Sequence, residues 1–167
     1  MSETKFTIKE DKKTLVVERV FPATRSKVWA AWTTPELFSK WWGPRGWNTI
    51  VKHMDFSNGG YLLYGMKCED PQQTDWYGQT SWGKSTYSDI DAESSFNYQD
   101  VFCDENGNVT PNMPVMNILI TFQEQVDNTV VTSTSVFDSP HDLEQVITMG
   151  MKEGLSQTWD RLEELVS

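Results

Sequence analysis

The chain has 167 residues, 38% of them hydrophobic, and a formal net charge of −10. This length and apolar content suit one ordinary core, so we expect residues 1–167 to form a single domain. No apolar run approaches the length of a membrane span, and no hydrophobic segment follows the charged start. The sequence therefore predicts a soluble, cytoplasmic protein with no membrane partner.

The charge is unevenly distributed along the chain. Residues 1–85 contain twelve basic and nine acidic residues, whereas residues 86–167 contain two basic and fifteen acidic ones. The second half would repel phosphate backbones, so nucleic-acid binding is not expected. A solvated acidic face that aids solubility is the simpler explanation, and an acidic docking surface is the alternative.

Cysteines and histidines are few and isolated. Cys68 and Cys103 form no CxxC motif, and His53 and His141 have no ligand-spaced partner. We expect reduced thiols and no zinc site, although a divalent ion held only by carboxylates stays open. The GxSxG, P-loop and dinucleotide glycine patterns are also missing, so no cofactor is predicted.

The chain begins with strand and then helix signals. "KFTIKEDKKTLVVERVF" predicts a hairpin or one long bent strand that ends at Pro22. "TRSKVWAAWT" has helical spacing with Thr24 as its N-cap, and "TPELFSKWW" predicts a second short helix capped by Thr34.

The middle of the chain is rich in strand patterns. "WNTIVKHMDF" and "YLLYGMKC" predict a hairpin closed by "SNGG", because Asn and Gly tolerate the backbone angles of a tight reversal. A polar loop with Trp76 and Tyr77 follows. "KSTYSDI", "SSFNYQDVFC", "VMNILITFQEQ" and "TVVTSTSVF" then predict four strands of an antiparallel meander.

The end of the chain predicts one long helix. Ser139 is placed to cap it and Pro140 to start it. Apolar or small residues then recur with a period of about 3.6 as far as Leu165, which indicates a face that packs on the sheet. Helices at both ends of a block of strands favour an α+β fold.

Five stretches in order carry a family resemblance: "TPELFSKWWGP", "MDFSNGGYLLYGM", "YSDIDAESSFNYQDVF", "ITFQEQVDNTVVTSTSVF" and "GMKEGLSQTWDRLEELV". The chain resembles the AHSA-type (activator of heat-shock-protein ATPase homologue-like) family of the START-like/SRPBCC superfamily over roughly residues 15–166. The resemblance implies a helix-grip fold, in which a curved antiparallel sheet wraps a long C-terminal helix and two short helices follow the first strand. It also implies a cavity between helix and sheet, which elsewhere in the superfamily holds small molecules. The polar segment Glu69–Gln79 is longer than the turn that the family would have there.

Two glycines of the C-terminal helix are candidate cavity residues. Gly150 and Gly154 lie four apart on the face expected to pack inward, and each costs about 1 kcal/mol relative to alanine inside a helix. They could leave cavity volume above the sheet, or allow a close approach of helix and sheet.

Strand alternation nominates further pocket residues. In "SSFNYQDVFC" it places Tyr98 and Asp100 on one face with Phe96 and Phe102. A buried carboxylate would have a raised pKa and suit a general base or an anchor for a ligand hydroxyl, whereas a bulge or a solvated cavity mouth would remove that role. His53 is a candidate partner for Asp100, although either face of its strand could point inward.

Apolar candidates come from two other strands and from the short helix. Tyr64 and Met66 share one face, and so do Met116 and Ile118; these would line a pocket toward its open end. In "SKWWGPRGWN", we expect one of Trp41 and Trp42 to seal the core and Trp42 to be the ring nearest a ligand.

Three functions follow from these observations. The first is binding of a small apolar or amphipathic molecule in an enclosed pocket of several hundred Å³. The second is a cyclase-like or hydratase-like enzyme that uses two facing acid–base groups in that pocket. The third is a chaperone-interacting module, which predicts an exposed apolar patch and a nearly filled cavity. A homodimer is left open.

Overall fold

A computed structural model describes residues 1–167. Its strands and helices, in chain order, are β1 (Lys5–Ile8), β2 (Thr14–Phe21), α1 (Arg25–Thr33), α2 (Pro35–Trp41), β3 (Trp47–Met54), β4 (Tyr61–Cys68), β5 (Thr80–Asp91), β6 (Ser95–Cys103), β7 (Met116–Gln125), β8 (Asn128–Phe137), α3 (Pro140–Thr148) and α4 (Met151–Val166). The α+β order and the expected strands are confirmed.

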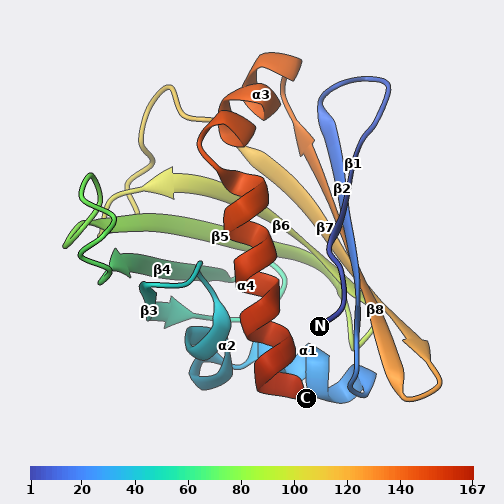
Figure 1. Ribbon diagram of the computed structural model, residues 1–167. Helices are drawn as coiled ribbons and strands as arrows, with labels where there is room; N and C mark the ends of the chain where they lie inside the picture. The colour runs from blue at the N-terminus through green and yellow to red at the C-terminus, as the bar shows by residue number, and fades with distance from the viewer.

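All eight strands form one antiparallel sheet in the order β1-β2-β8-β7-β6-β5-β4-β3. The meander from β3 to β8 follows the chain, and the β1–β2 hairpin then pairs with β8. The helix α4 crosses one face of the curved sheet, with α1 and α2 at one end and α3 at the other (Figure 1). This is the expected helix-grip arrangement.

The C-terminal helix is two helices, not the single one predicted. Ser139 caps α3 by accepting a hydrogen bond from the backbone N–H of Asp142, at 3.2 Å. The chain then leaves the helix at Met149, and Gly150 begins α4 with a positive φ of 91°. Because a left-handed residue cannot continue a right-handed helix, the periodic pattern is interrupted there.

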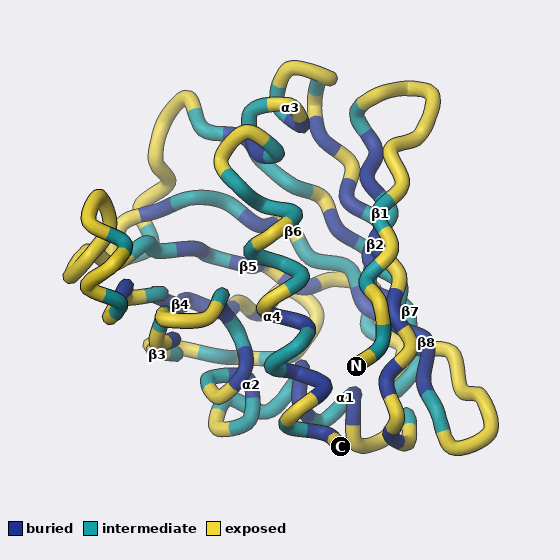
Figure 2. The backbone as a smooth tube through the Cα atoms, in the orientation of Figure 1, coloured by how far each residue is buried: buried dark blue, intermediate teal, exposed yellow.

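The core lies between α1, α2, the C-terminal half of α4 and the inner face of the sheet. The buried residues of α4 begin at Thr158 and continue to Val166. From residue 147 to residue 157 no residue is buried, so the α3–α4 junction and the start of α4 cover the sheet loosely (Figure 2).

A buried cation fixes the end of α4 to the sheet. Arg19 of β2 donates from Nη1 to Asp160 Oδ1 at 2.6 Å and from Nη2 to Glu163 Oε1 at 3.1 Å. Burial raises the pKa of Glu163, but the hydrogen bonds from Ser2 and Arg19 outweigh it and hold the pKa below the usual value. These ion pairs orient α4 across the strands.

Candidate functional site

Two neighbouring tryptophans at the end of α2 have different surroundings. Trp41 is fully buried, and its indole N–H donates to the carbonyl of Ala31 at 2.9 Å. Trp42 is half-buried and stacks on Phe38, with ring centroids 5.1 Å apart. Gly43 ends this segment with a φ of 101°. Trp41 therefore seals the core and Trp42 is the more exposed of the two rings, while its role beside a ligand stays a prediction.

A small cavity lies between these rings and the inner face of the sheet. It has a volume of about 10 Å³, which is the room for about one water molecule. Nine residues line it: Trp32, Phe38, Trp42, Leu62, Tyr64, Ser85, Tyr87, Phe96 and Tyr98. The enclosed pocket of several hundred Å³ that the sequence led us to expect is not open in this structure, because aromatic rings fill the space.

A carboxylate lies beside this cavity. Asp100 of β6 is only 9% exposed and points to the inner face, as the alternation predicted. Ser85 Oγ donates to Asp100 Oδ1 at 3.0 Å, and the Tyr64 hydroxyl lies 3.3 Å from both carboxylate oxygens. Burial raises the pKa of Asp100 to about 7, although the Ser85 and Tyr64 hydroxyls act to lower it.

A glycine allows the Tyr64 ring to reach this carboxylate. Gly83 lies directly opposite Tyr64 on β5, and a Cβ added to it would lie 2.5 Å from the tyrosine hydroxyl oxygen. The phenol therefore lies flat over the neighbouring strand, with its oxygen toward β6. Any larger residue at position 83 would push the hydroxyl away from Asp100.

The tyrosine hydroxyls of the site stay protonated at neutral pH. Burial and the nearby Asp100 carboxylate raise the pKa of Tyr64 well above its ordinary value, and the same two causes raise the pKa values of Tyr98 and Tyr87. The site therefore combines neutral hydrogen-bond donors with one carboxylate that exchanges its proton near neutral pH.

Most of the apolar candidates lie on the same inner face. The strand register places Met66 in the row of Tyr64, and it pairs Met116 with Asp100 and Ile118 with Tyr98. Met66 and Met116 are half-buried and pack against the core, whereas Ile118 is buried. None of the three lines the small cavity itself.

His53 lies on the opposite face of the sheet, which corrects its assignment as a pocket residue. The β3–β4 pairing shifts register between Val51 and His53, so residue 52 is a bulge. His53 is consequently aligned with Leu63 and stacks on Tyr61, with ring centroids 4.3 Å apart. The candidate Asp100–His53 pair is therefore not formed.

The two glycines also differ from expectation. Gly150 is the N-cap of α4, not an interior helix residue, so its lack of a side chain is explained by its left-handed backbone. Gly154 lies within α4, and an added Cβ would meet no atom within 4 Å. Open space beside Gly154 argues against close helix–sheet approach as its cause.

Sequence reasoning missed one polar member of the site. Ser85 lies directly opposite Asp100 across the β5–β6 ladder. Alternation within "GKSTY" would have placed Ser85 on the face of Gly83 and Tyr87, but nothing in the sequence gave the register of the two strands.

No group of three or more His, Cys, Asp or Glu side chains is arranged to hold a metal ion. No helix combines the length and apolar character that a membrane crossing requires.

Comparison with known proteins identifies the family of this chain. The family model described as "Activator of Hsp90 ATPase homolog 1-like protein" matches residues 22–167. The chain belongs to this family. No curated protein matches the sequence.

Several solved structures agree with the fold. Protein Ms6760 from Mycobacterium smegmatis is 27% identical with a TM-score of 0.87, and the match covers 100% of this chain and 98% of that one. A Staphylococcus epidermidis protein solved by NMR is 32% identical with a TM-score of 0.79, covering 96% and 93%. A protein from Arthrobacter aurescens, at 23% identity and a TM-score of 0.87 over 97% and 90%, supports the fold alone.

Proposed function

We propose that this member of the family binds a small amphipathic molecule between α4 and the inner face of the sheet, with Asp100 as the polar anchor. The observation that carries the proposal is one buried, hydrogen-bonded carboxylate in surroundings that are otherwise aromatic and apolar. Ligand sites in proteins combine apolar walls with a few convergent polar groups in this way.

The loose half of α4 supports a route for the ligand. Met151 and Leu155 are half-buried over the core, and so are Met66 and Met116 on the sheet. Methionine side chains are flexible and adapt to varied apolar surfaces. Outward displacement of these side chains would open space between the start of α4 and the sheet without breaking the Arg19 ion pairs at the far end of α4.

The chemistry of Asp100 narrows the ligand class. As a carboxylate it only accepts hydrogen bonds, and two of its neighbours already donate to it. A ligand hydroxyl or amine would replace the donation of Tyr64 or add to it. We therefore expect an apolar molecule that bears at least one hydrogen-bond donor.

Native mass spectrometry of protein purified from its source cells is the direct test. We expect a co-purifying molecule that is lost from Asp100→Asn and from Trp42→Ala. His53→Ala is the matched control, because His53 lies on the opposite face. In parallel, the neutral apolar dye N-phenyl-1-naphthylamine should bind the wild type and compete with the extracted molecule. Absence of both bound molecule and dye binding would contradict the proposal.

The filled core also favours a second candidate, a protein-interaction module that acts on a chaperone ATPase, as the family description suggests. A nearly filled cavity and exposed aromatic side chains such as Trp76 are what this function requires. The test is the ATPase rate of an Hsp90-type chaperone with and without this protein. An unchanged rate at saturating protein would exclude this candidate and leave the first untouched.

A further inference from the structure

The loop between β4 and β5, residues 69–79, is held in one conformation by its own hydrogen bonds. We call it the Trp76 loop. The N–H groups of Trp76 and Tyr77 both donate to the carbonyl of Gln73, at 3.0 and 2.9 Å. Its two ends are joined by bonds from Gly78 to Cys68 at 2.9 Å and from Cys68 to Gln79 at 3.0 Å. Because the loop is already ordered, a partner that binds it does not have to lose the conformational entropy of ordering it.

This ordered loop exposes two large aromatic side chains. Trp76 is 53% exposed and Tyr77 is 57% exposed. Behind them, the half-buried Trp47 lies with its ring centroid 6.4 Å from that of Trp76, and its indole N–H donates to Gln73 Oε1 at 3.1 Å. Tryptophan and tyrosine are enriched among the residues that dominate the binding energy of protein interfaces. Here both side chains are carried by a loop that its own hydrogen bonds hold in place.

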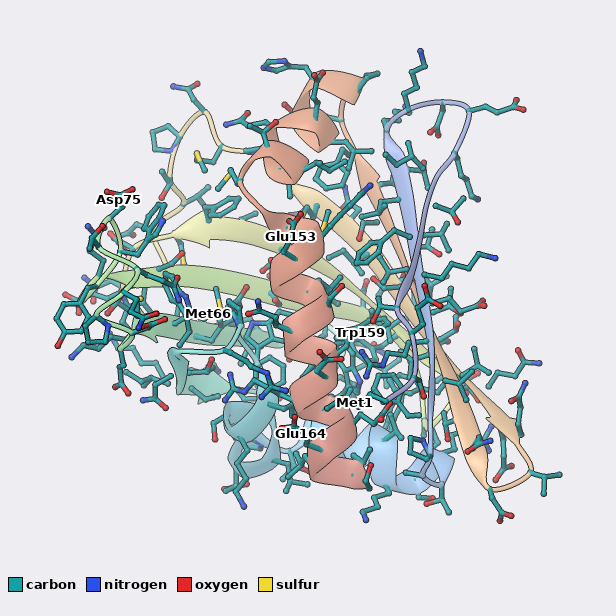
Figure 3. All side chains as sticks on the ribbon, in the orientation of Figure 1. Met1, Met66, Asp75, Glu153, Trp159 and Glu164 are labelled. Atoms are coloured by element: carbon teal, nitrogen blue, oxygen red, sulfur yellow. The ribbon has the colours of Figure 1, made fainter.

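The charge carried by the loop itself is negative. The Trp76 loop contains Glu69, Asp70 and Asp75 and no basic residue. Asp70 is occupied within the loop, because its Oδ1 accepts from the backbone N–H of Gln72 at 3.0 Å. The carboxylates of Glu69 and Asp75 make no hydrogen bond or ion pair. Asp75 projects at the end of the sheet, far from α4 (Figure 3).

We propose that the Trp76 loop is a docking surface for an arginine-bearing segment of a partner protein. A guanidinium is planar and weakly hydrated, so it stacks on indole and phenol faces while it donates to a carboxylate. Trp76 and Tyr77 offer the faces, Asp75 offers a free acceptor next to them in the chain, and Glu69 adds a second free carboxylate in the same loop. The same charge disfavours nucleic acids and anionic membranes.

The proposal is independent of the cavity, so it is tested without reference to any small molecule. The probe is a capped hexapeptide of alternating arginine and glycine, titrated into the isotope-labelled full chain by NMR. We expect shifts of the Trp76 and Trp47 indole signals and an affinity that falls several-fold when sodium chloride is raised from about 50 to 300 mM. Trp76→Ala and Asp75→Asn should each weaken binding by at least about fivefold.

Two matched controls separate this surface from general charge attraction. Asp127→Asn removes a carboxylate from the distant β7–β8 turn and should leave the affinity unchanged. The same peptide with glutamine in place of arginine should not bind. Equal binding to the Trp76→Ala variant, or tighter binding of a neutral hexasaccharide than of the arginine peptide, would overturn the proposal. Unchanged thermal unfolding of the exposed-site variants confirms that they remain folded.

Discussion

At the scale of single residues, the environment of Asp100 depends on the lack of a side chain at position 83. The hydroxyl of Tyr64 reaches the carboxylate only because Gly83 has no side chain under the ring. A mirrored arrangement occurs on the other face, where Trp82 covers Gly65. Aromatic rings that lie over strand glycines thus fill space on both faces of the β4–β5 pair.

We expect Gly83→Ala to lower the free energy of unfolding by about 2 kcal/mol, because the new methyl group overlaps the Tyr64 hydroxyl. Urea unfolding measures this change. In a Tyr64→Ala background the same substitution should cost much less, since the clashing atoms are gone. Equal costs in the two backgrounds would show that Gly83 is needed for another reason.

Asp100 should make stability depend on pH in a defined direction. Its pKa in the folded state, about 7, exceeds the ordinary value of 3.8, so between these values the folded state binds more protons than the unfolded state. Its stabilising contribution is complete below the ordinary pKa and is lost as pH rises through about 7. The shift of about three pH units corresponds to about 4 kcal/mol.

The measurement is denaturant unfolding at several pH values between about 4.5 and 7.5. Asp100→Asn keeps an acceptor for Ser85 and Tyr64 but carries no charge, so its stability should fall less across this range than that of the wild type. An unchanged slope in Asp100→Asn would assign the pH dependence to other groups.

At the scale of elements, Gly150 and Gly154 show how one residue type serves two purposes in one segment. Gly150 turns the chain between α3 and α4 with a positive φ, whereas Gly154 lies inside α4 beside open space. The spacing of four residues suggested that both glycines serve the same role, but the backbone conformation shows that Gly150 is a helix cap and Gly154 an interior helix residue.

The same substitution should therefore have opposite effects at the two positions. Gly154→Ala should raise the unfolding free energy by up to about 1 kcal/mol, because alanine favours the helix and its methyl group meets nothing. Gly150→Ala should lower it by about 1 kcal/mol, because the left-handed backbone strains any Cβ. Thermal unfolding of the two variants side by side measures both effects. A higher stability of Gly150→Ala than of the wild type would contradict the role given to the left-handed backbone at this position.

The sequence predicted those elements whose pattern is set by burial on one face. The alternation in β6 placed Tyr98 and Asp100 inward, because a strand that covers a core must alternate. Alternation left the face of His53 open, and a single bulged residue, which has no sequence signal here, turns His53 outward. Cavity size was also beyond prediction, since it depends on how the aromatic rings interlock.

At the scale of the whole molecule, a buried arginine connects an early strand to the last helix through ion pairs. Arg19 comes from the second strand, and Asp160 and Glu163 come from the last helix. Without the arginine, Glu163 would be a buried carboxylate with no cation. An exposed ion pair also reaches the same helix, between Glu164 of α4 and Arg45 from the segment between α2 and β3.

We expect Arg19→Met to lower the unfolding free energy by about 3 to 5 kcal/mol, because it leaves a buried charge unpaired. Arg45→Met is the matched control, and it should cost less than about 1 kcal/mol since its ion pair is solvated. Both are measured by guanidinium unfolding at neutral pH. Similar losses in the two variants would mean that burial of Arg19 adds nothing beyond an ordinary surface pair.

The strand order has a consequence for synthesis on the ribosome. The early strand β2 pairs with β8, so that Leu15 lies opposite Ser135 and Phe21 opposite Thr129. Pairings between such distant parts of a chain form slowly, and they cannot form at all until the later part has been made. The apolar side chains of β2 therefore stay exposed to water and to neighbouring nascent chains while more than a hundred residues are added. Aggregation during translation should start from this first hairpin.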